Sequence, residues 1–457
     1  MFKFFNHHLS RRLTILSLVE VVTLFYAGVL PYQWRLALPS GDGQYLGAAV
    51  FSVSMVLAML IVGLYSVRIV SLHTLIQRLL IAGFIALLAM SLAFYVSHTV
   101  YVGRGVVMYS AALGMVGVVV VRTLFFWITG AAMLKRRLLI LGSRDEANRI
   151  IALNNTDPRF SNILIMGFVE VSAEGCATDG YRQCDPAPLQ RLVRDAKIDE
   201  IVLAVQQRRG GVLPLRQLLD CKLSGIKIVD LITFYEREVG ILPLHNLRSG
   251  WLLTSDGFDV GGWRDVLKRM VDVLAALIIL SLTFPLLLVA AFAVAIESGF
   301  PVFFRQERVG AGGKTFAMLK LRSMRKDAEA DGTAQWACVN DPRITRVGRI
   351  IRATRIDELP QLLNILKGDM SFVGPRPERP AFVRQLLQEV AYYDLRHSIK
   401  PGLTGWAQVR YAYGASVAEA AAKLQYDLYY VKNHSLLLDL LIMVQTLEVI
   451  FLRKGAR

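Results

Sequence analysis

Two adjacent acids are the residues whose types and spacing first suggest chemistry in this chain. Asp357 and Glu358 stand just before the segment PQLLNILK, residues 360–367, which Gly368 follows. Proline favours the first turn of a helix and glycine its end, so the segment predicts a two-turn helix. Its expected buried face consists of Leu362, Leu363 and Leu366. The helix N-terminus keeps nearby carboxylates ionised and favours anions and their metal counterions. One acid can attack or hold a metal while the other assists.

Basic residues crowd around this acid pair. Arg376 lies between Pro375 and Pro377, which restrict its backbone, and a planar guanidinium suits phosphate oxygens. Five arginines recur at every third position before the acids: Arg343, Arg346, Arg349, Arg352 and Arg355. An acid pair surrounded by arginines suggests phosphoryl transfer with a divalent metal ion, of which Mg²⁺ is favoured on chemical grounds. The residues alone leave a second interpretation open, in which Asp357 caps the helix, Glu358 is a surface acid and the arginines form a solvated or lipid-binding face.

The first third of the chain has the composition of a membrane protein. Residues 1–130 hold only two acids and eight Lys or Arg, in a chain that is 54% hydrophobic. Four apolar segments, 13–33, 46–67, 78–97 and 106–132, each approach the ~20 residues that cross a bilayer. Basic residues precede the first segment, separate the second from the third and follow the fourth. This pattern predicts four transmembrane helices over residues 1–132 with both ends in the cytoplasm.

Charge and cysteine content exclude some function classes. The net charge is +16, but no helix-turn-helix, zinc-finger or aromatic RNA-binding pattern accompanies it, so we expect no nucleic-acid partner. The cysteines (Cys176, Cys184, Cys221 and Cys338) form no CxxC pair and predict neither a metal site nor a disulfide framework. Arg122 lies inside the fourth apolar segment, where pairing or snorkelling is favoured over a substrate role.

Residues 138–243 alternate short apolar runs with helical stretches. The runs are LLILG, ILIMGFVEV, EIVLAV and IKIVDL. Such alternation predicts a parallel βαβ sheet and thus a Rossmann-like α/β domain. Its first turn keeps only Gly142 of a dinucleotide fingerprint and places Asp145 and Glu146 where an anion would bind. A scaffold or dimerisation role is therefore favoured over a regulatory nucleotide or NAD.

Residues 268–297 contain a fifth long apolar stretch with Pro285 near its middle. Proline kinks or breaks a helix, and basic residues flank the stretch on both sides. We therefore expect a re-entrant helix that enters the membrane, breaks at Pro285 and returns. Beyond it, VFFRQERV and TFAMLKLRSM flank GAGGK and predict a β-hairpin. The hairpin is not a phosphate-binding P-loop, because Arg308 stands where that motif needs glycine.

The C-terminal region supplies two further expectations. The apolar segment 434–454 contains Asp439 and Glu448 and is expected to form a helix at the membrane surface. Trp406 is expected at the membrane interface, with stacking on uracil as the alternative.

Residues 264–457 resemble the bacterial polyprenyl-phosphate sugar-1-phosphate transferases, monotopic phosphoglycosyl transferases that begin exopolysaccharide and O-antigen assembly. The matching stretches are KRMVDV, FFRQERVG, KLRSMR, RIDELPQLLNILKGDMSFVGPRPERP, IKPGLTGWAQV and YDLYYVKNHSLLLDLLIM. With the helices and middle domain before it, the chain resembles long, exopolysaccharide-type members. The resemblance implies an α+β catalytic domain carrying the re-entrant helix. The family often has serine before the helix-breaking proline, where this chain has Phe284, and RYAYGAS departs from a common Asn-Gly-Arg, so the sugar stays open.

The resemblance also implies roles for individual residues. Asp357 would be the nucleophile that attacks the sugar-bearing phosphate of a UDP-sugar and releases UMP, and it would hold Mg²⁺. Glu358 would assist, and the sugar-phosphate would then pass to undecaprenyl phosphate. The residues expected at the substrate phosphate are Lys320, Arg352, Arg376 and Pro377. The implied setting is the bilayer of the bacterial inner (cytoplasmic) membrane, with the middle and catalytic domains in the cytoplasm and the chain a homodimer.

Two alternatives belong to other function classes. Membrane nucleotide-sugar dehydratases also join four helices to a similar middle domain, but they need an NAD fingerprint and a Tyr-x-x-x-Lys pair. No tyrosine here stands four residues before a lysine. A non-catalytic membrane assembly factor is the second alternative, and the intact pair Asp357-Glu358 argues against it.

Overall fold

The computed structural model divides the chain into two compact units, Met1–Val239 and Gly240–Arg457, which we describe separately. The residues described are 2–4, 7–9, 11–36, 42–65, 72–96, 103–129, 135–156, 163–170, 189–205, 213–258, 262–325, 341–411 and 416–452. The finer division into 1–132, 138–243 and 264–457 stays a prediction.

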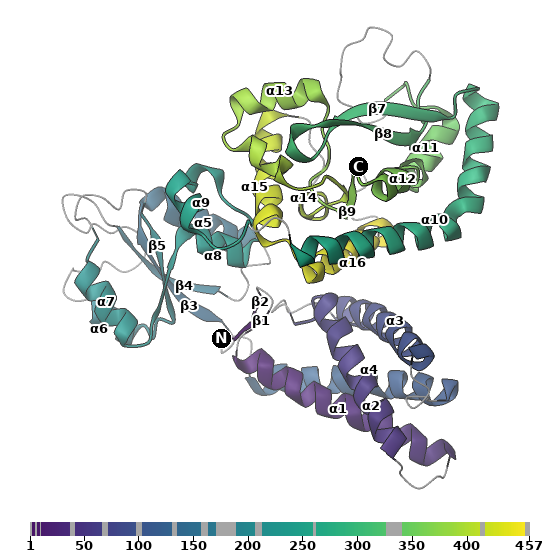
Figure 1. Cartoon of the computed structure of the whole chain (residues 1–457). Helices are drawn as coiled ribbons and strands as arrows, with labels where there is room; N and C mark the ends of the chain where they lie inside the picture. Colours follow the sequence, from purple (N-terminus) through teal and green to yellow (C-terminus); the bar gives the residue numbers. More distant parts are fainter. Residues whose placement is uncertain are drawn as a thin grey trace. The chain divides into compact units, whose positions relative to one another are not determined.

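Four helices stand near the start of the first unit, after a short antiparallel pair of strands (Figure 1). The elements are β1 (Phe2–Phe4), β2 (His7–Leu9), α1 (Arg11–Leu36), α2 (Asp42–Ile61), α3 (Leu72–Val96) and α4 (Arg104–Thr129). Helix α2 ends earlier than the predicted residue 67, because the chain turns at Gly63, whose φ is +75°. By length and composition, Leu75–Tyr95 and Gly105–Phe125 can cross a membrane, whereas the described apolar stretches Ile15–Pro31 and Gln44–Leu60 are shorter.

Arg122 of α4 is paired inside this group of helices, as the favoured interpretation predicts. Its Nε donates to Oε1 of Glu20 on α1 at 2.6 Å, and its Nη1 donates to the carbonyl of Leu64 at 2.7 Å. Glu20 and Arg122 are both buried. A buried charge needs a partner in an apolar setting, so this pair fixes α1 against α4.

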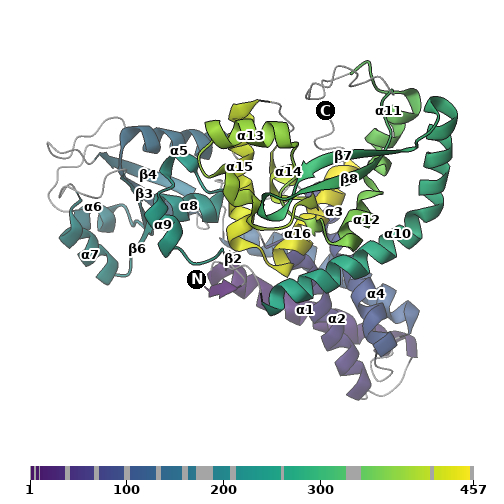
Figure 2. The same cartoon turned by 45° about the horizontal axis from the view of Figure 1, so that its top comes forward.

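The first unit continues with a four-stranded parallel sheet in the order β4-β3-β5-β6, which confirms the strands expected from the apolar runs. Its elements are β3 (Arg136–Gly142), α5 (Arg144–Thr156), β4 (Ile163–Glu170), α6 (Leu189–Asp195), β5 (Glu200–Ala204), α7 (Leu215–Leu223), β6 (Lys227–Asp230) and α8 (Leu231–Glu238). In both views α6 and α7 lie on one side of the sheet and α5 and α8 on the other (Figures 1 and 2).

The second unit surrounds a core to which elements far apart in sequence contribute. They are α9 (Ser249–Thr254), α10 (Trp263–Ser298), β7 (Phe303–Val309), β8 (Thr315–Leu321), α11 (Arg346–Ala353), α12 (Gln361–Lys367), β9 (Ser371–Val373), α13 (Pro380–Glu389), β10 (Gly402–Thr404), α14 (Trp406–Arg410), α15 (Val417–Asn433) and α16 (Leu436–Leu452), with 3-10 turns at Leu244–Asn246, Ala311–Gly313, Ile356–Glu358 and Tyr393–Ser398. Strands β7 and β8 form the predicted antiparallel hairpin, and β9 pairs with β10 in parallel.

Helix α10 is one continuous helix across Pro285, so the predicted break is instead a bend of the helix axis, visible in Figure 1. A proline removes a single backbone donor, and the remaining N–H groups on either side can keep their helical partners. By length and composition α10 can also cross a membrane.

Both halves of α10 are attached to the same unit. In the first half, Asp272 accepts the backbone N–H of Phe372 at 3.2 Å. In the second half, Leu287 and Val294 pack against Leu321 and Ile351. Large apolar side chains on other faces of both halves stay exposed, among them Leu274, Ile278, Leu282, Val289, Phe292 and Ile296.

One of the two expectations for the C-terminal region is corrected. Trp406 lies neither at an interface nor free to stack on a base: it is buried, its indole donates to the carbonyl of Gly240 at 2.8 Å, and it stacks on Tyr429. Helix α16 buries Leu441 and Ile442 in the core, because the chain folds it back onto the unit. Its position at a membrane surface stays a prediction.

Candidate functional site

Asp357 and Glu358 lie in the 3-10 turn Ile356–Glu358 just before α12, as the sequence predicts. Pro360 is the N-cap of α12, and Gly368 ends the helix with a left-handed φ of 97°. The predicted buried face is partly wrong, since Leu363 is 44% exposed and Ile365 is fully buried. The helix turns this way because the buried side chain of Asn364 faces β8.

Asn364 ties the acid-bearing turn to β8, the strand that carries Lys320. Its Oδ1 accepts the backbone N–H of Leu319 at 3.0 Å, and its Nδ2 donates to the carbonyl of Ala317 at 2.8 Å. A buried amide that saturates backbone groups fixes their register. The lysine on β8 and the acids before α12 are therefore held on one rigid support.

The loop that carries Arg376 is fixed through its backbone. Gly374 donates its N–H to the carbonyl of Thr404 at 2.9 Å, and Arg308 donates to the carbonyl of Pro377 at 3.0 Å. The Arg376 guanidinium then reaches Glu358, with 3.2 Å between Nη2 and Oε1. The structure thus brings together the acid pair and the predicted phosphate-binding residues of β8 and this loop.

Asp357 is the carboxylate of the pair that can still accept a hydrogen bond or bind a cation. It is 7% exposed, and its buried Oδ1 has no hydrogen-bond partner within the described parts of the chain. Burial, with the neighbouring charge of Glu358, raises its pKa to about 6 despite the cations Lys320 and Arg352 nearby. A buried acceptor without a partner is uncommon in folded proteins and marks a place where a ligand or cation can bind.

Glu358 and Lys320 have opposite roles in the local electrostatics. Burial would raise the pKa of Glu358, but Arg376 and Lys320 outweigh it and hold that pKa at about 2. Burial and the charge of Arg376 lower the pKa of Lys320 to about 8. The side chain of Lys320 makes no hydrogen bond or ion pair with any described residue. Glu358 is thus a fixed anion that orients cations, and Lys320 is a cation that an added phosphate would stabilise.

The regularly spaced arginines divide into separate groups. Arg343 forms an ion pair with Asp341 at 2.6 Å, and Arg355 forms one with Glu358 at 3.3 Å. Arg352, in the last turn of α11, is among the cations that lower the pKa of Asp357. The remaining two, Arg346 and Arg349, line a pocket beside α11.

Arg396 and Asp427 are site-supporting residues that sequence patterns do not reveal. Arg396 donates to the carbonyl of Arg376 at 2.8 Å and pairs with Asp427 at 2.9 Å, and both side chains are buried. Burial raises the pKa of Asp427 to about 6, although Arg396 favours its ionised form. In the sequence, Arg396 and Asp427 are simply charged residues in partly apolar segments. Nothing in that pattern identifies them as partners.

The carboxylates of the site are too few to bind a divalent cation alone, but they suit a cation that a substrate phosphate also binds. Among the described residues, no group of three or more His, Cys, Asp or Glu side chains could hold a metal ion alone. Mg²⁺ usually binds through one or two carboxylates together with substrate phosphates. The carboxylate of Asp357, whose Oδ1 has no partner within the described residues, could supply one such ligand.

Comparisons with known proteins relate this chain to bacterial sugar transferases. Residues 263–453 match the family described as bacterial sugar transferase. The chain is 43% identical over 245 residues to a UDP-N-acetylgalactosamine-undecaprenyl-phosphate N-acetylgalactosaminephosphotransferase from Aeromonas hydrophila, covering 53% of this chain and 56% of the relative. It is 37% identical to a UDP-glucose:undecaprenyl-phosphate glucose-1-phosphate transferase from Xanthomonas campestris pv. campestris, covering 57% and 55%. The chain thus spans a little over half the length of these two relatives.

A further relative is matched over more of both chains. It is a UDP-glucose:undecaprenyl-phosphate glucose-1-phosphate transferase from Escherichia coli (strain K12), with 32% identity over 364 residues. The match covers 76% of this chain and 75% of that relative, so the likeness extends well before residue 263.

Proposed function

The chain belongs to the bacterial sugar transferase family, and from this premise we propose that it transfers a sugar-1-phosphate from a UDP-sugar to undecaprenyl phosphate. The observation that carries the proposal is the buried carboxylate of Asp357, whose Oδ1 has no partner among the described residues. The cations Lys320 and Arg352 act on this carboxylate, and Arg376 pairs with the adjacent Glu358. The printed names of the relatives support the two substrates and differ in the sugar, so the sugar itself stays open.

The proposed reaction has two displacements at one phosphorus atom. Asp357 Oδ1 attacks the phosphorus that bears the sugar, and the bond from that phosphorus to the bridging oxygen breaks, so UMP leaves with this oxygen. An oxygen of the lipid phosphate then attacks the same phosphorus and breaks its bond to Asp357, which restores the carboxylate. Such a covalent step divides one difficult transfer into two.

The surrounding residues position and neutralise charge. Lys320, Arg352 and Arg376 would hold the phosphate oxygens, and the loop containing Pro377 fixes the direction of Arg376. Glu358, held ionised, orients Arg376 through the ion pair at 3.2 Å. The carboxylate of Asp357 would help to hold Mg²⁺, which when bound would supply positive charge to neutralise the phosphate groups.

Radiolabelled UDP-sugars test the function directly. Membranes containing the full chain are incubated with undecaprenyl phosphate, Mg²⁺ and one labelled UDP-sugar at a time. Appearance of labelled lipid together with UMP supports the proposal. If none of a panel of UDP-glucose, UDP-galactose and their N-acetylated forms yields labelled lipid or UMP, the proposed activity is refuted.

The pH dependence of the transfer follows from the pKa of Asp357. Because only the ionised carboxylate attacks, kcat/KM should fall about tenfold per pH unit below pH about 6, where the pKa lies. Glu358 contributes to raising that pKa, so Glu358→Gln should move the acid limb of the residual activity to lower pH. Initial rates from pH 4.5 to 8 measure the acid limb of the unmodified chain and that of the variant. An acid limb that stays in place in Glu358→Gln would contradict this assignment.

The membrane arrangement is proposed on the attachments of α10. Asp272 near its start and Val294 near its end both contact other elements of the second unit. This supports a re-entrant helix with both ends in the cytoplasm. The setting would be the bacterial inner membrane, with a homodimer as the expected oligomer. Light scattering from the purified chain in detergent measures that oligomeric state.

Cysteine accessibility checks the re-entrant helix. In intact cells, Phe300→Cys should resist an impermeant thiol reagent added outside and react only after permeabilisation, because Phe300 is 75% exposed just after α10. Thr99→Cys, in a loop predicted to face outward, is the matched control and should react in intact cells. Labelling of Phe300→Cys from outside would show that α10 crosses.

For the middle domain we propose a Rossmann-like scaffold role. Packing explains the glycine at position 142, because a Cβ there would lie 2.2 Å from the carbonyl oxygen of Ala204. Asp145 and Glu146 occupy the first turn of α5, where a nucleotide phosphate would otherwise meet the helix N-terminus. Both observations favour packing over dinucleotide binding.

A further inference from the structure

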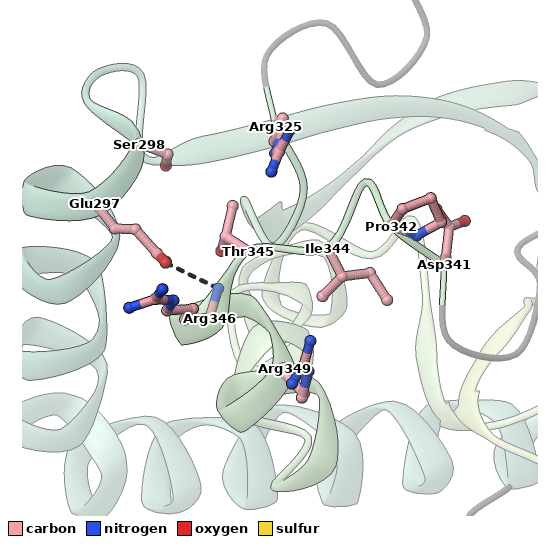
Figure 3. A pocket seen from close by; sticks show the side chains of 9 residues that line it. All are labelled: Glu297, Ser298, Arg325, Asp341, Pro342, Ile344, Thr345, Arg346 and Arg349. Carbon is pink, nitrogen blue, oxygen red and sulfur yellow. Dashed lines mark hydrogen bonds between the residues drawn. The ribbon is translucent and has the colours of Figure 1, made fainter.

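A pocket of about 760 Å³ lies between the C-terminal end of α10 and α11 (Figure 3). Asp357 and Glu358 are not among its lining residues, so it is distinct from the acid pair. Three arginines line it: Arg325 after β8, and Arg346 and Arg349 on α11. Figure 3 shows Arg325 and Arg349 reaching into it from opposite sides.

The positive charge of this pocket is only partly balanced. Within the described part of the chain, none of the three guanidinium groups makes a hydrogen bond or an ion pair. The two acids of the lining have other bonds: Glu297 accepts the backbone N–H groups of Arg346 and Val347 at 2.8 and 2.9 Å, and Asp341 pairs with Arg343. Arg346 lies beside Glu297, whereas Arg325 and Arg349 face each other across the cavity (Figure 3). Two guanidinium groups placed in this way suit an oxyanion with several acceptor oxygens, such as phosphate.

The surroundings of the pocket are apolar and exposed. Ile296 is 71% and Phe300 75% exposed, on either side of the lining residues Glu297 and Ser298, and Ile350 next to Arg349 is 64% exposed. They continue the exposed apolar surface of α10. A free phosphate or a nucleotide would leave this surface unused, whereas a lipid would bury it while its headgroup enters the pocket.

The pocket also adjoins the acid pair. Arg349 lines it, and Arg352 lies three residues further along α11, so both arginines are on neighbouring positions of one helix face. Arg352 is among the cations that act on both carboxylates, Asp341 in the pocket wall and Asp357 beyond it. A phosphate held by the pocket would therefore lie on the α11 side of Asp357.

We propose that this pocket binds the phosphate group of a membrane lipid. Arg325 and Arg349 hold the phosphate oxygens, Arg346 adds positive charge at the pocket wall, and the lipid chain lies against the exposed apolar residues of α10. The inference goes beyond the proposed transfer, because it assigns lipid binding to residues outside the set around Asp357. The same chemistry is offered by two sources, a polyprenyl phosphate and an anionic phospholipid.

Equilibrium binding to the full chain in detergent tests the proposal without any turnover. The probes are undecaprenyl phosphate, dioleoylphosphatidylglycerol and UDP, each measured against the unmodified chain and two double variants. The test variant is Arg325→Gln/Arg349→Gln. The matched control, Arg305→Gln/Arg384→Gln, removes the same charge from exposed positions that do not line the pocket.

The test variant should bind lipid phosphate at least about tenfold more weakly, while UDP binding and the control variant stay within about twofold. Weakening for undecaprenyl phosphate alone identifies an acceptor site, and weakening for both lipids identifies a general phospholipid site; either supports the proposal. Unchanged lipid binding overturns it, and so does weaker UDP binding with unchanged lipid binding, which would mark a nucleotide pocket. Because no transfer is measured, failure here leaves the proposed activity standing.

Discussion

Replacing Asp357 with asparagine is expected to lower sugar-phosphate transfer by at least about 10³-fold, because the amide cannot form the proposed phospho-enzyme bond. Asparagine keeps the size of the side chain in a site that is 7% exposed, so the loss should not come from unfolding. The measurement is the rate of labelled lipid formation, together with label retained on the protein after denaturation when undecaprenyl phosphate is omitted.

Glu358→Gln is the matched control for the nucleophile. It removes the adjacent negative charge and the ion pair with Arg376 but leaves the attacking oxygen of Asp357 in place. It should therefore slow transfer while still forming labelled protein. Labelled protein in Asp357→Asn, or turnover at the unmodified rate, would refute Asp357 as the nucleophile.

Asp427→Asn is expected to destabilise the second unit by about 3–5 kcal/mol, because it leaves the guanidinium of Arg396 buried without its counterion. This corresponds to a fall in Tm on the order of 10 °C. Thermal unfolding of the full chain in detergent measures it, and Arg384→Gln, an exposed arginine of the same unit, should leave Tm unchanged.

The double variant Arg396→Met/Asp427→Leu separates stability from positioning. Replacing a buried ion pair with apolar side chains often costs little, so its Tm should return to near that of the unmodified chain. Its kcat/KM should nevertheless stay at least about tenfold low, because the carbonyl of Arg376 has lost the donor that holds its loop. A stable double variant with full activity would show that Arg396 has no positioning role.

Local patterns predicted the elements of the site well. The segment PQLLNILK, which begins with proline and is followed by glycine, carries the signals that start and end a helix, and α12 follows them. The β7–β8 hairpin and the strands of the parallel sheet also follow from alternating or continuous apolar runs. These features depend on neighbours within a few residues, which a sequence displays directly.

What the sequence could not provide is the identity of distant partners. Leu363 and Ile365 are equally apolar, and the buried Asn364, bonded to β8, decides which of them faces the core. Trp406 is buried because the carbonyl of Gly240 and the ring of Tyr429 meet it, and both are remote in sequence. The pair of Arg396 and Asp427 is likewise formed by a turn and a helix that only the fold brings together.

Glu297 connects the end of α10 to the start of α11, and thereby to the acid pair. The last residues of α10 hold the first N–H groups of α11, and the other end of α11 carries Arg352 beside Asp357. Helix α11 is thus tied at one end to the C-terminal half of α10, which carries the exposed Phe292 and Ile296. If that half lies in the bilayer as proposed, we expect a change in its tilt to move Arg352 relative to Asp357, and the transfer rate to depend on the thickness of the membrane.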